Sequence, residues 1–537
     1  MNKEGLLSNI AQSIERFFNS KKQIAVLAIA IAVIVLMVLG ISIYRISQMY
    51  IEGDLLTDVQ NQHNRHIHLS VFKHSLYMLL LATILTVGIM LFLKVKLEYV
   101  FIVAALGLGM AYMMAITPLS VPDESYHYHG AYAVSGYMLF EQDPYIGDIR
   151  HFDFSSTVIR QNTILTYLRF MREGVFFIDR DPEQMNYQVE FNVVYPLWHA
   201  PQALGISIAR LIGLSFFGGF YLGRFFNLLF YALCVSFSIK RLKAFKLPIF
   251  FIGLLPMCLH QAASFSYDAY VNGISMLFIA YAISCVYEKS TFSWRDYSML
   301  LVLGILLAPA KVVYLPIIFL VFLVAWKWKK DIKAKAWVLA SSIAIISVMA
   351  VIYTNYGYFN VIGGIEQEPN YFGGQNYRLS FIFENPIETI MIFFRSITYY
   401  YNFWFYGIFG LYLSGLTMYV PLWLINVTIL MLIASVFCGK RDEWQPTISH
   451  RVIYFIVAVV VFGLCLASHF LGWTSDTFLM IAGVQGRYFL PILPLLLLLL
   501  KCSKIQIESK NYRFALIVGY IMVQSHVIEY IINWTIR

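Results

Sequence analysis

The stretch Val121-Pro-Asp-Glu-Ser-Tyr-His-Tyr-His129 carries two adjacent carboxylates and two histidines, residue types that serve as acids, bases and ligands. It follows the apolar run 101–117, so it lies where a membrane helix would emerge into water. If a helix starts at Pro122, Asp123 and His127 lie one turn apart on the same face. The stretch therefore predicts a reaction site at a membrane surface.

The same residues have two other interpretations, as metal ligands or as an ordinary helix start. Glu124 and His129 would face other directions than Asp123, so the four side chains would not converge on one ion. A divalent metal is possible but not favoured, and no metal ligand is assigned. Acidic residues also suit the positive N-terminal end of any helix, and that end would keep a carboxylate ionised.

Polar residues also gather at the ends of apolar runs that are far apart in the sequence. Those expected on the same side of the membrane as Asp123 are Arg224, Asn227, Gln261, Ser264, Tyr267, Asp268, Lys311, Gln485, Arg487 and Tyr488. Ionisable groups at membrane depth are costly and usually functional, so the shared end predicts a pocket. Simpler interpretations stay open, because a lone arginine can extend to the interface and an aspartate can cap a helix.

The chain as a whole has the composition of a membrane protein. Of its 537 residues, 59% are hydrophobic and 13% are charged, and the mean hydropathy is +0.68. Helices of roughly 20 apolar residues cross a bilayer with every backbone group satisfied. About thirteen such spans are expected, near 23–46, 75–93, 98–117, 220–239, 247–263, 267–287, 297–310, 312–326, 336–354, 416–437, 452–470, 488–501 and 514–533. The predicted fold is an all-α polytopic membrane helix bundle.

The basic residues predict the topology. The net charge of +9 lies mainly in short loops such as 240–246, 327–335 and 501–513, which the positive-inside rule places in the cytoplasm. The charge is thus a topology signal, and no nucleic-acid partner is expected. The N-terminus is then cytoplasmic. Three expected spans precede Asp123 and thirteen precede the C-terminus, so both are expected outside. The six cysteines lie in spans or beside basic loops, so a disulfide framework is not expected.

Two long segments are expected on the outer face, near 118–219 and 355–415. Both contain aromatic amphipathic stretches, at 195–205 and 393–404. We interpret these stretches as helices that lie in the membrane interface.

Four motifs occur together in the chain: Pro122-Asp-Glu-x-x-His127, Pro256-Met-x-x-x-Gln261 followed by Ser264 and Asp268, Lys311-x-x-Tyr314-x-Pro316, and Gly483-Val-Gln-Gly-Arg-Tyr-Phe-Leu-Pro491. With this combination the chain resembles the bacterial polytopic membrane family of unknown function 2142. That family is similar to the GT-C superfamily of glycosyltransferases, which use polyprenyl-phosphate sugars and carry an acidic motif in the first large outer loop. The resemblance divides the chain into N-terminal spans, 1–97, and a GT-C-like integral membrane domain, 98–537.

The resemblance implies an inverting glycosyltransferase on the outer face of the bacterial cell membrane. It would move a sugar from a polyprenyl-phosphate donor to a surface glycan or another exported acceptor, with the isoprenoid tail in membrane lipid between helices. No cofactor is assigned. The implied catalytic residues are Asp123 as base, Glu124 and His127; the donor phosphate would contact Arg487, Lys311 and, more weakly, Arg224; and the other pocket residues would be His129, Gln261, Ser264, Asp268, Tyr314, Gln485 and Tyr488.

Two alternatives stay open. A polysaccharide polymerase or ligase would also act on lipid-linked glycans, but such enzymes usually place key arginines in a large, late outer loop and lack an early Asp-Glu element. A transporter of lipid-linked glycans would have charges near mid-bilayer and two related halves, whereas here the charges lie at helix ends and no halves repeat.

Overall fold

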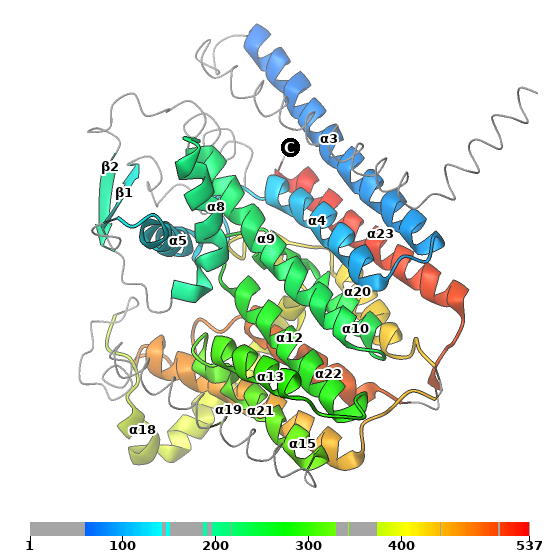
Figure 1. Cartoon of the computed structure of the whole chain (residues 1–537). Helices are drawn as coiled ribbons and strands as arrows, with labels where there is room; N and C mark the ends of the chain where they lie inside the picture. The colour runs from blue at the N-terminus through cyan, green and yellow to red at the C-terminus, as the bar shows by residue number, and fades with distance from the viewer. Residues whose placement is uncertain are drawn as a thin grey trace, which may run out of the picture.

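The computed structural model describes residues 59–141, 146–150, 186–190, 196–214, 216–328, 342, 373–440, 442–502 and 505–535. These residues form a bundle in which long helices from distant parts of the chain run side by side (Figure 1). Within the described residues, six helices are long and apolar enough to cross a membrane: α3 (Val59–Phe92), α4 (Leu97–Ala115), α9 (Phe216–Arg241), α12 (Asp268–Tyr287), α21 (Ile448–Gly472) and α23 (Lys510–Thr535). Each corresponds to an expected span, and together they support a helical membrane protein.

Three other expected spans are not uniform α-helices. The stretch 247–263 is two helices, α10 (Lys246–Gly253) and α11 (Pro256–Ala262). Pro256 lacks an N–H and disfavours helical geometry in Leu255, so a continuous helix cannot pass. The stretches 312–326 and 488–501 change helix type along their length. They consist of η3 (Val312–Tyr314), α14 (Leu315–Ile318) and α15 (Leu320–Lys327), and of η4 (Gly486–Ile492) and α22 (Leu493–Leu500).

Two further expected spans differ from the structure, the first in position and the second in length. The span at 297–310 is α13 (Trp294–Leu307), and the span at 416–437 is reduced to α20 (Leu422–Val436). A small antiparallel sheet of β3 (Tyr412–Leu413) and β4 (Met418–Tyr419) occupies the start of the latter. The expected span 23–46 and, except for residue 342, the expected span 336–354 lie outside the described residues. The described part of the chain thus contains six full-length spans and three shorter apolar helical segments, and the number thirteen stays a prediction.

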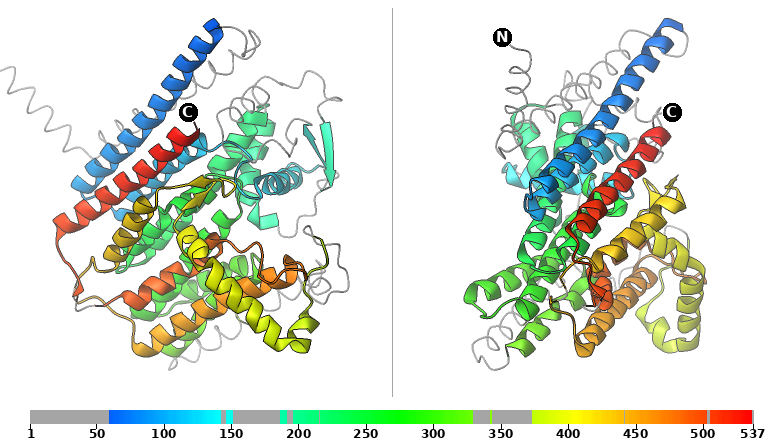
Figure 2. Two further views of the ribbon diagram at one scale, coloured as in Figure 1. Left: turned by 180° about the vertical axis from the view of Figure 1, so that it is seen from behind. Right: turned by 90° about the vertical axis from the view of Figure 1, so that its right-hand side faces the viewer.

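The two long segments between spans contain helices that cover one end of the bundle. The first holds α5 (Glu124–Met138), β1 (Ile146–Arg150) paired antiparallel with β2 (Asn186–Glu190), η2 (Pro196–Trp198) and α8 (Ala200–Leu211). The second holds α18 (Leu379–Glu384) and α19 (Pro386–Ile408). Helix α19 crosses the direction of α3 and α23 (Figure 2, left), and it exposes apolar side chains along its length, among them Ile387, Ile390 and Phe394.

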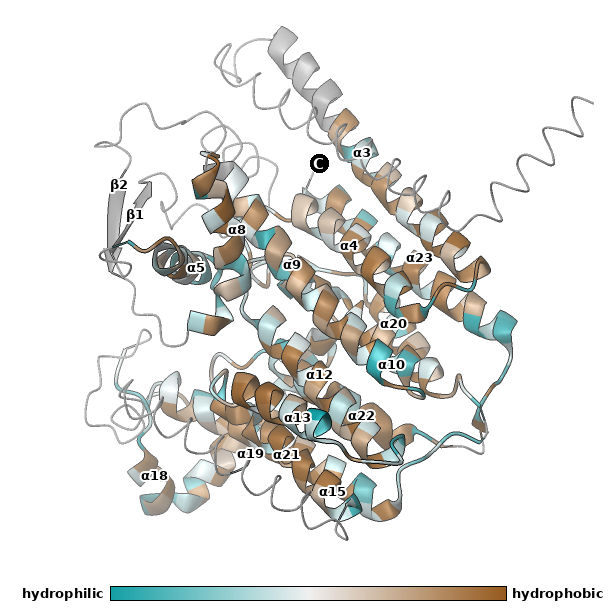
Figure 3. Cartoon of the chain, viewed as in Figure 1, coloured by the Kyte–Doolittle hydropathy of each residue, from teal (hydrophilic) through white to brown (hydrophobic). Residues whose placement is uncertain are grey.

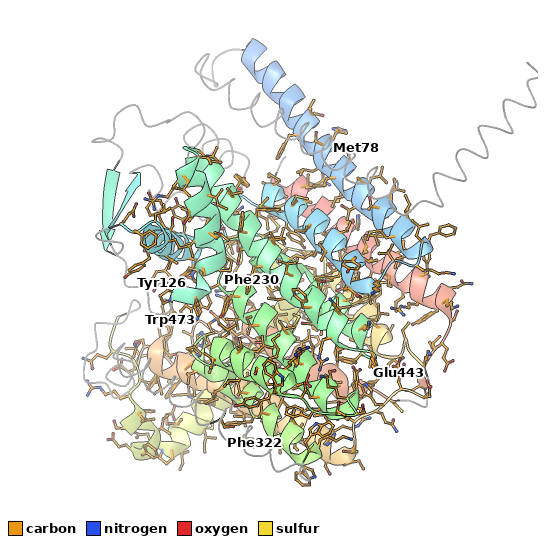
Figure 4. All side chains as sticks on the ribbon, viewed as in Figure 1. Met78, Tyr126, Phe230, Phe322, Glu443 and Trp473 are labelled. Atoms are coloured by element: carbon orange, nitrogen blue, oxygen red, sulfur yellow. The ribbon has the colours of Figure 1, made fainter. Side chains whose placement is uncertain are left out.

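Helix α9 occupies the middle of the bundle and packs against α4, α8 and α12. Apolar residues dominate along the helices, and hydrophilic residues gather toward their ends, as at the starts of α10 and α23 (Figure 3). Different residues and helices lie at the two ends of the bundle. Ion pairs such as Lys501 with Glu443 lie at one end, and α5 and the start of α12 lie at the other. Figure 4 shows Tyr126 and Trp473 on the side of the bundle opposite to Glu443.

Candidate functional site

Four charged residues form a continuous chain where α5, α12 and η4 meet. Asp268, the first residue of α12, lies between two cations: its Oδ1 is 3.0 Å from Nζ of Lys311, and its Oδ2 is 3.4 Å from Nε of Arg487. The Nη2 group of Arg487 extends the chain to Oδ2 of Asp123, at 3.1 Å. The structure therefore brings together residues from four separate motifs, with Asp268 as the bridge.

The guanidinium of Arg487 is buried, and only some of its N–H groups have a close hydrogen-bond partner. Its side chain is only 3% exposed. The Nη1 group lies 3.4 Å from Oε1 of Gln261 and Nη2 lies 3.5 Å from Oη of Tyr488, both beyond the usual hydrogen-bond range. Among the described residues, Nε has an ion-pair contact with Asp268 but no hydrogen-bond partner. A buried guanidinium in this condition has donor capacity left for an anion.

The backbone that carries Arg487 is fixed by α19. The indole N–H of Trp404 donates to the carbonyl oxygen of Val484, at 3.1 Å. At Gly486, a Cβ atom would lie 2.3 Å from the carbonyl oxygen of Trp404, so only glycine allows this approach. The contact between α19 and η4 thus sets the position of Arg487.

Arg224, in contrast, has all its donors engaged. Its Nε and Nη2 groups donate to both carboxylate oxygens of Glu124, at 2.9 and 2.7 Å. Its remaining N–H groups donate to three backbone carbonyl oxygens at the C-terminal end of α4. Glu124 also accepts from the backbone N–H of Phe265, and both side chains of the ion pair are 0% exposed. This geometry indicates that the pair joins α4, α5 and α9, and it leaves neither residue open to a substrate.

Asp123 precedes α5 and does not lie within it. The helix begins at Glu124, later than the expected start at Pro122, and Asp123 has φ +61°, in the left-handed region. Aspartate is a favoured helix cap, yet this side chain makes no capping hydrogen bond. It turns toward Arg487 and is 61% exposed. Asp123 is thus the exposed carboxylate of the site, and it does not share a helix face with His127 as the sequence predicted.

His127 turns inward. Its ring packs edge-on against Tyr267, with centroids 4.7 Å apart, and lies 5.6 Å from the ring of His199. Burial lowers the pKa of His127 to about 3 and holds the pKa of His199 well below its usual value. Neither Nδ1 atom has a hydrogen-bond partner within the described residues. Two neutral imidazoles therefore form the inner wall of the site.

Aromatic rings surround the ammonium of Lys311. Its Nζ lies 4.6 Å from the ring centroid of Tyr267 and 4.7 Å from that of Tyr488. Trp198 stacks on Tyr267, and the hydroxyl of Tyr314 donates to the carbonyl oxygen of Tyr488 at 2.9 Å. These rings favour a cation at this position and restrict its movement.

The other predicted pocket residues have different surroundings. Ser264 fixes the turn before α12, because its Oγ donates to the carbonyl oxygen of Gln261 and accepts from the backbone N–H of Ser266. Gln485 precedes η4 and is half-buried. His129 lies on α5, where burial lowers its pKa to about 4. Gln261 contacts the charged chain directly, with its Oε1 3.4 Å from Nη1 of Arg487.

Sequence reasoning missed several residues around the site. The sequence predicts only that Trp198 and His199 belong to an interfacial stretch. A histidine inside such an aromatic stretch was the one sequence feature that could have indicated a site residue. His260 accepts from the backbone N–H of Ser414 at 3.0 Å, and the hydroxyl of Ser414 donates to the carbonyl oxygen of Ser120 at 3.1 Å. These bonds join α11 and the β3–β4 sheet to the segment before α5. Contacts over such separations leave no local pattern in the sequence.

Together, the site offers an exposed carboxylate that can accept a proton and two cations that can bind an anion. Within the described residues, no three His, Cys, Asp or Glu side chains are grouped so that they could hold a metal ion. Phosphate groups suit the cation pair, because arginine and lysine bind them through charge-assisted hydrogen bonds.

A family model described as "Predicted membrane protein (DUF2142)" matches residues 106–496, a segment that includes Asp123, Asp268, Lys311 and Arg487. Comparisons with curated proteins and with solved structures gave no match. The matched segment is well over half of the 537 residues and confirms the family resemblance. The chain therefore belongs to this family of predicted membrane proteins.

Proposed function

We propose that the protein is a membrane glycosyltransferase of GT-C type that takes a sugar from a polyprenyl-phosphate donor. The observation that carries the proposal is the contrast between the two buried arginines. Arg224 has a full set of hydrogen-bond partners, whereas Arg487 has one hydrogen bond of ordinary length, to the exposed carboxylate of Asp123, and lies beside a second cation. Leaving a buried guanidinium under-satisfied is costly unless a ligand completes its hydrogen bonds.

The donor phosphate is assigned to Arg487 and Lys311. Arginine can bind two phosphate oxygens at once, and lysine supplies a second point charge. Asp268 contacts both cations, so it fixes their separation and keeps them in place when the donor is absent. Arg224, which the sequence offered as a third phosphate ligand, is excluded from this role in the proposal because its donors are occupied.

Asp123 is assigned as the general base. The oxygen of an acceptor hydroxyl forms a bond to the anomeric carbon, and the bond from that carbon to the phosphate oxygen breaks. The electron pair stays on the phosphate, where Arg487 and Lys311 stabilise the added charge. The hydroxyl proton moves to the carboxylate of Asp123. Glu124 is too deeply buried to share this role, so we assign it a structural part.

The site is proposed to face the outside of the cell membrane. The C-terminal ends of α9 and α15 carry Lys240, Arg241 and Lys327 and lie at the end of the bundle remote from Asp123. The positive-inside rule favours a cytoplasmic position for such basic ends. The acceptor is then a surface glycan or another exported molecule, and the isoprenoid tail of the donor lies in lipid beside the bundle.

A transfer assay tests the proposal. The full-length protein is purified, placed in lipid nanodiscs and supplied with a panel of polyprenyl-phosphate sugars and outer-surface glycan acceptors. Mass spectrometry should detect a glycosylated acceptor and free polyprenyl phosphate with one donor. Asp123→Asn protein, prepared in parallel, controls for contaminating enzymes. If the wild-type protein forms no more product than this variant with every donor, the proposed function is wrong.

A further inference from the structure

We propose that Asp123 is a latch on the phosphate site: it occupies Arg487 in the empty protein, and the arriving phosphate displaces it. The inference rests on the proposed function, since it takes the donor phosphate as the displacing anion. It adds a second role to Asp123, because the displaced carboxylate becomes available as the base only when a donor is bound.

The positions of the two side chains support displacement. The Arg487 side chain is 3% exposed and the Asp123 side chain, which contacts its Nη2, is 61% exposed. Asp123 thus lies between the guanidinium and solvent. An anion that approaches Arg487 from the aqueous side meets Asp123 first, whereas Asp268 is only 8% exposed and lies deeper.

The charges of the site lead to the same conclusion. Two cations, Lys311 and Arg487, are matched by two carboxylates, Asp123 and Asp268. A phosphate anion added to this neutral set would be repelled by any carboxylate that shares its cation. Asp268 is held by both cations, so Asp123, held by one, is the carboxylate that leaves.

The backbone at Asp123 does not resist this movement. The side chain makes no capping bond to α5, so no helix contact is lost when it turns away. Its left-handed φ of +61° is uncommon for a residue other than glycine. Such geometry is maintained by surrounding contacts, here the ion pair of the side chain with Arg487 and the hydrogen bond that the Asp123 carbonyl oxygen accepts from the backbone N–H of His127.

The latch makes an unusual prediction for binding: removal of an acidic residue from the site should tighten anion binding. We expect Asp123→Ala and Asp123→Asn to lower the Kd for phosphate by about tenfold, since a lost charge-assisted contact of this kind corresponds to at least that factor. If Asp123 only orients Arg487, the same variants would bind phosphate less tightly.

The experiment is isothermal titration calorimetry on the full-length protein in detergent, with inorganic phosphate, geranyl phosphate and geraniol as separate probes. Tighter binding of both phosphates indicates a general phosphate site, and tighter binding of geranyl phosphate alone indicates a lipid phosphate. Both results support the latch. In the Asp123→Ala background, a further Arg487→Gln change should remove the gain.

The matched control is Glu141→Ala, which removes another partly exposed carboxylate that is paired with an arginine, Arg210, on the neighbouring α8. Equal tightening in Glu141→Ala, tighter binding of geraniol, or unchanged or weaker phosphate binding in both Asp123 variants would overturn the latch. The transfer assay is independent of this result. Sugar transfer without tighter binding removes the latch alone, and tighter binding without transfer removes the glycosyltransferase assignment alone.

Discussion

The guanidinium of Arg224 donates hydrogen bonds to both carboxylate oxygens of Glu124, at 2.9 and 2.7 Å, and both side chains are fully buried. The two residues come from α9 and α5, which are separated in the chain by the segment that contains α8. The pair therefore connects α5, which carries Glu124 and His127 of the site motif, to the centre of the bundle.

Glu124→Gln should destabilise the protein strongly. The amide cannot neutralise Arg224, and removing one partner of a buried ion pair typically costs about 3–5 kcal/mol. The free energy of unfolding, measured by SDS titration in mixed micelles, should fall by an amount in this range. The exposed Arg295→Ala is the control and should change little. The double change Glu124→Leu with Arg224→Met removes both charges, so it should lower the free energy of unfolding by less than the sum of these two single changes. A loss equal to that sum would contradict this role.

Asp123→Asn should reduce sugar transfer by about 10²–10⁴-fold, the usual contribution of a general base. The side chain is mostly exposed and caps no helix, so the melting temperature should stay close to that of the wild type. Turnover numbers and thermal melts on the same preparations test both statements. Near-normal turnover in this variant would assign the base to another group.

Arg487→Lys should weaken binding of the donor phosphate by roughly tenfold or more, although the charge is kept, because an ammonium cannot replace the forked donors of a guanidinium. Lys311→Ala should weaken the same step. Since Asp268 contacts both cations, the effects should be less than additive in the double variant. Donor titrations on the two single variants and the double variant measure this. Full additivity would show that the two cations bind separate groups.

Acid should destabilise the protein partly through His127. Burial is the main cause that lowers its pKa to about 3. The nearby charge of Asp268 raises this pKa, and those of Arg487 and Lys311 lower it further. The unfolded chain takes up this proton near pH 6.5, so between pH 6.5 and about 3 the unfolded state binds more protons. The free energy of unfolding should therefore fall as the pH is lowered through this window, by about 1.4 kcal/mol per pH unit for one proton.

His127→Gln removes the group that takes up this proton in the unfolded state. Its melting temperature should depend less steeply on pH between 6.5 and 5 than that of the wild type. Melts at half-unit pH steps in one buffer series provide the comparison. Parallel curves for the two proteins would mean that His127 is not buried as a neutral imidazole.

The topology predicts that Ser125 and Gln485 face outside and that Lys243 faces the cytoplasm. Single cysteines at these positions, in a background without the six native cysteines, should react differently with a membrane-impermeant maleimide. In intact cells the first two should be labelled, and the third only after lysis. Labelling of position 243 in intact cells would reverse the orientation and the proposed side of the reaction.

The sequence by itself determined the membrane class and most helix positions. Hydrophobic helices of the required length are a local property, so α4, α9, α12, α21 and α23 lie close to their expected ranges. The break before Pro256 also has its cause in the sequence, but hydropathy alone does not detect the missing N–H of a proline, and so it predicts a continuous span there. The predicted spans between Asp123, Asp268, Lys311 and Arg487 are even in number, which predicts that these residues share one side.

Only the tertiary structure decided what each charged group does. Gly223-Arg224-Phe225 and Gly486-Arg487-Tyr488 look alike in the sequence, and Asp123 and Glu124 are neighbours. The difference arises from partners distant in the chain: carbonyl oxygens at the end of α4 complete the shell of Arg224, and Asp268 and Gln261 leave that of Arg487 incomplete. Hydrogen-bond satisfaction and solvent access depend on the whole packed structure, so no local pattern separates the structural ion pair from the site.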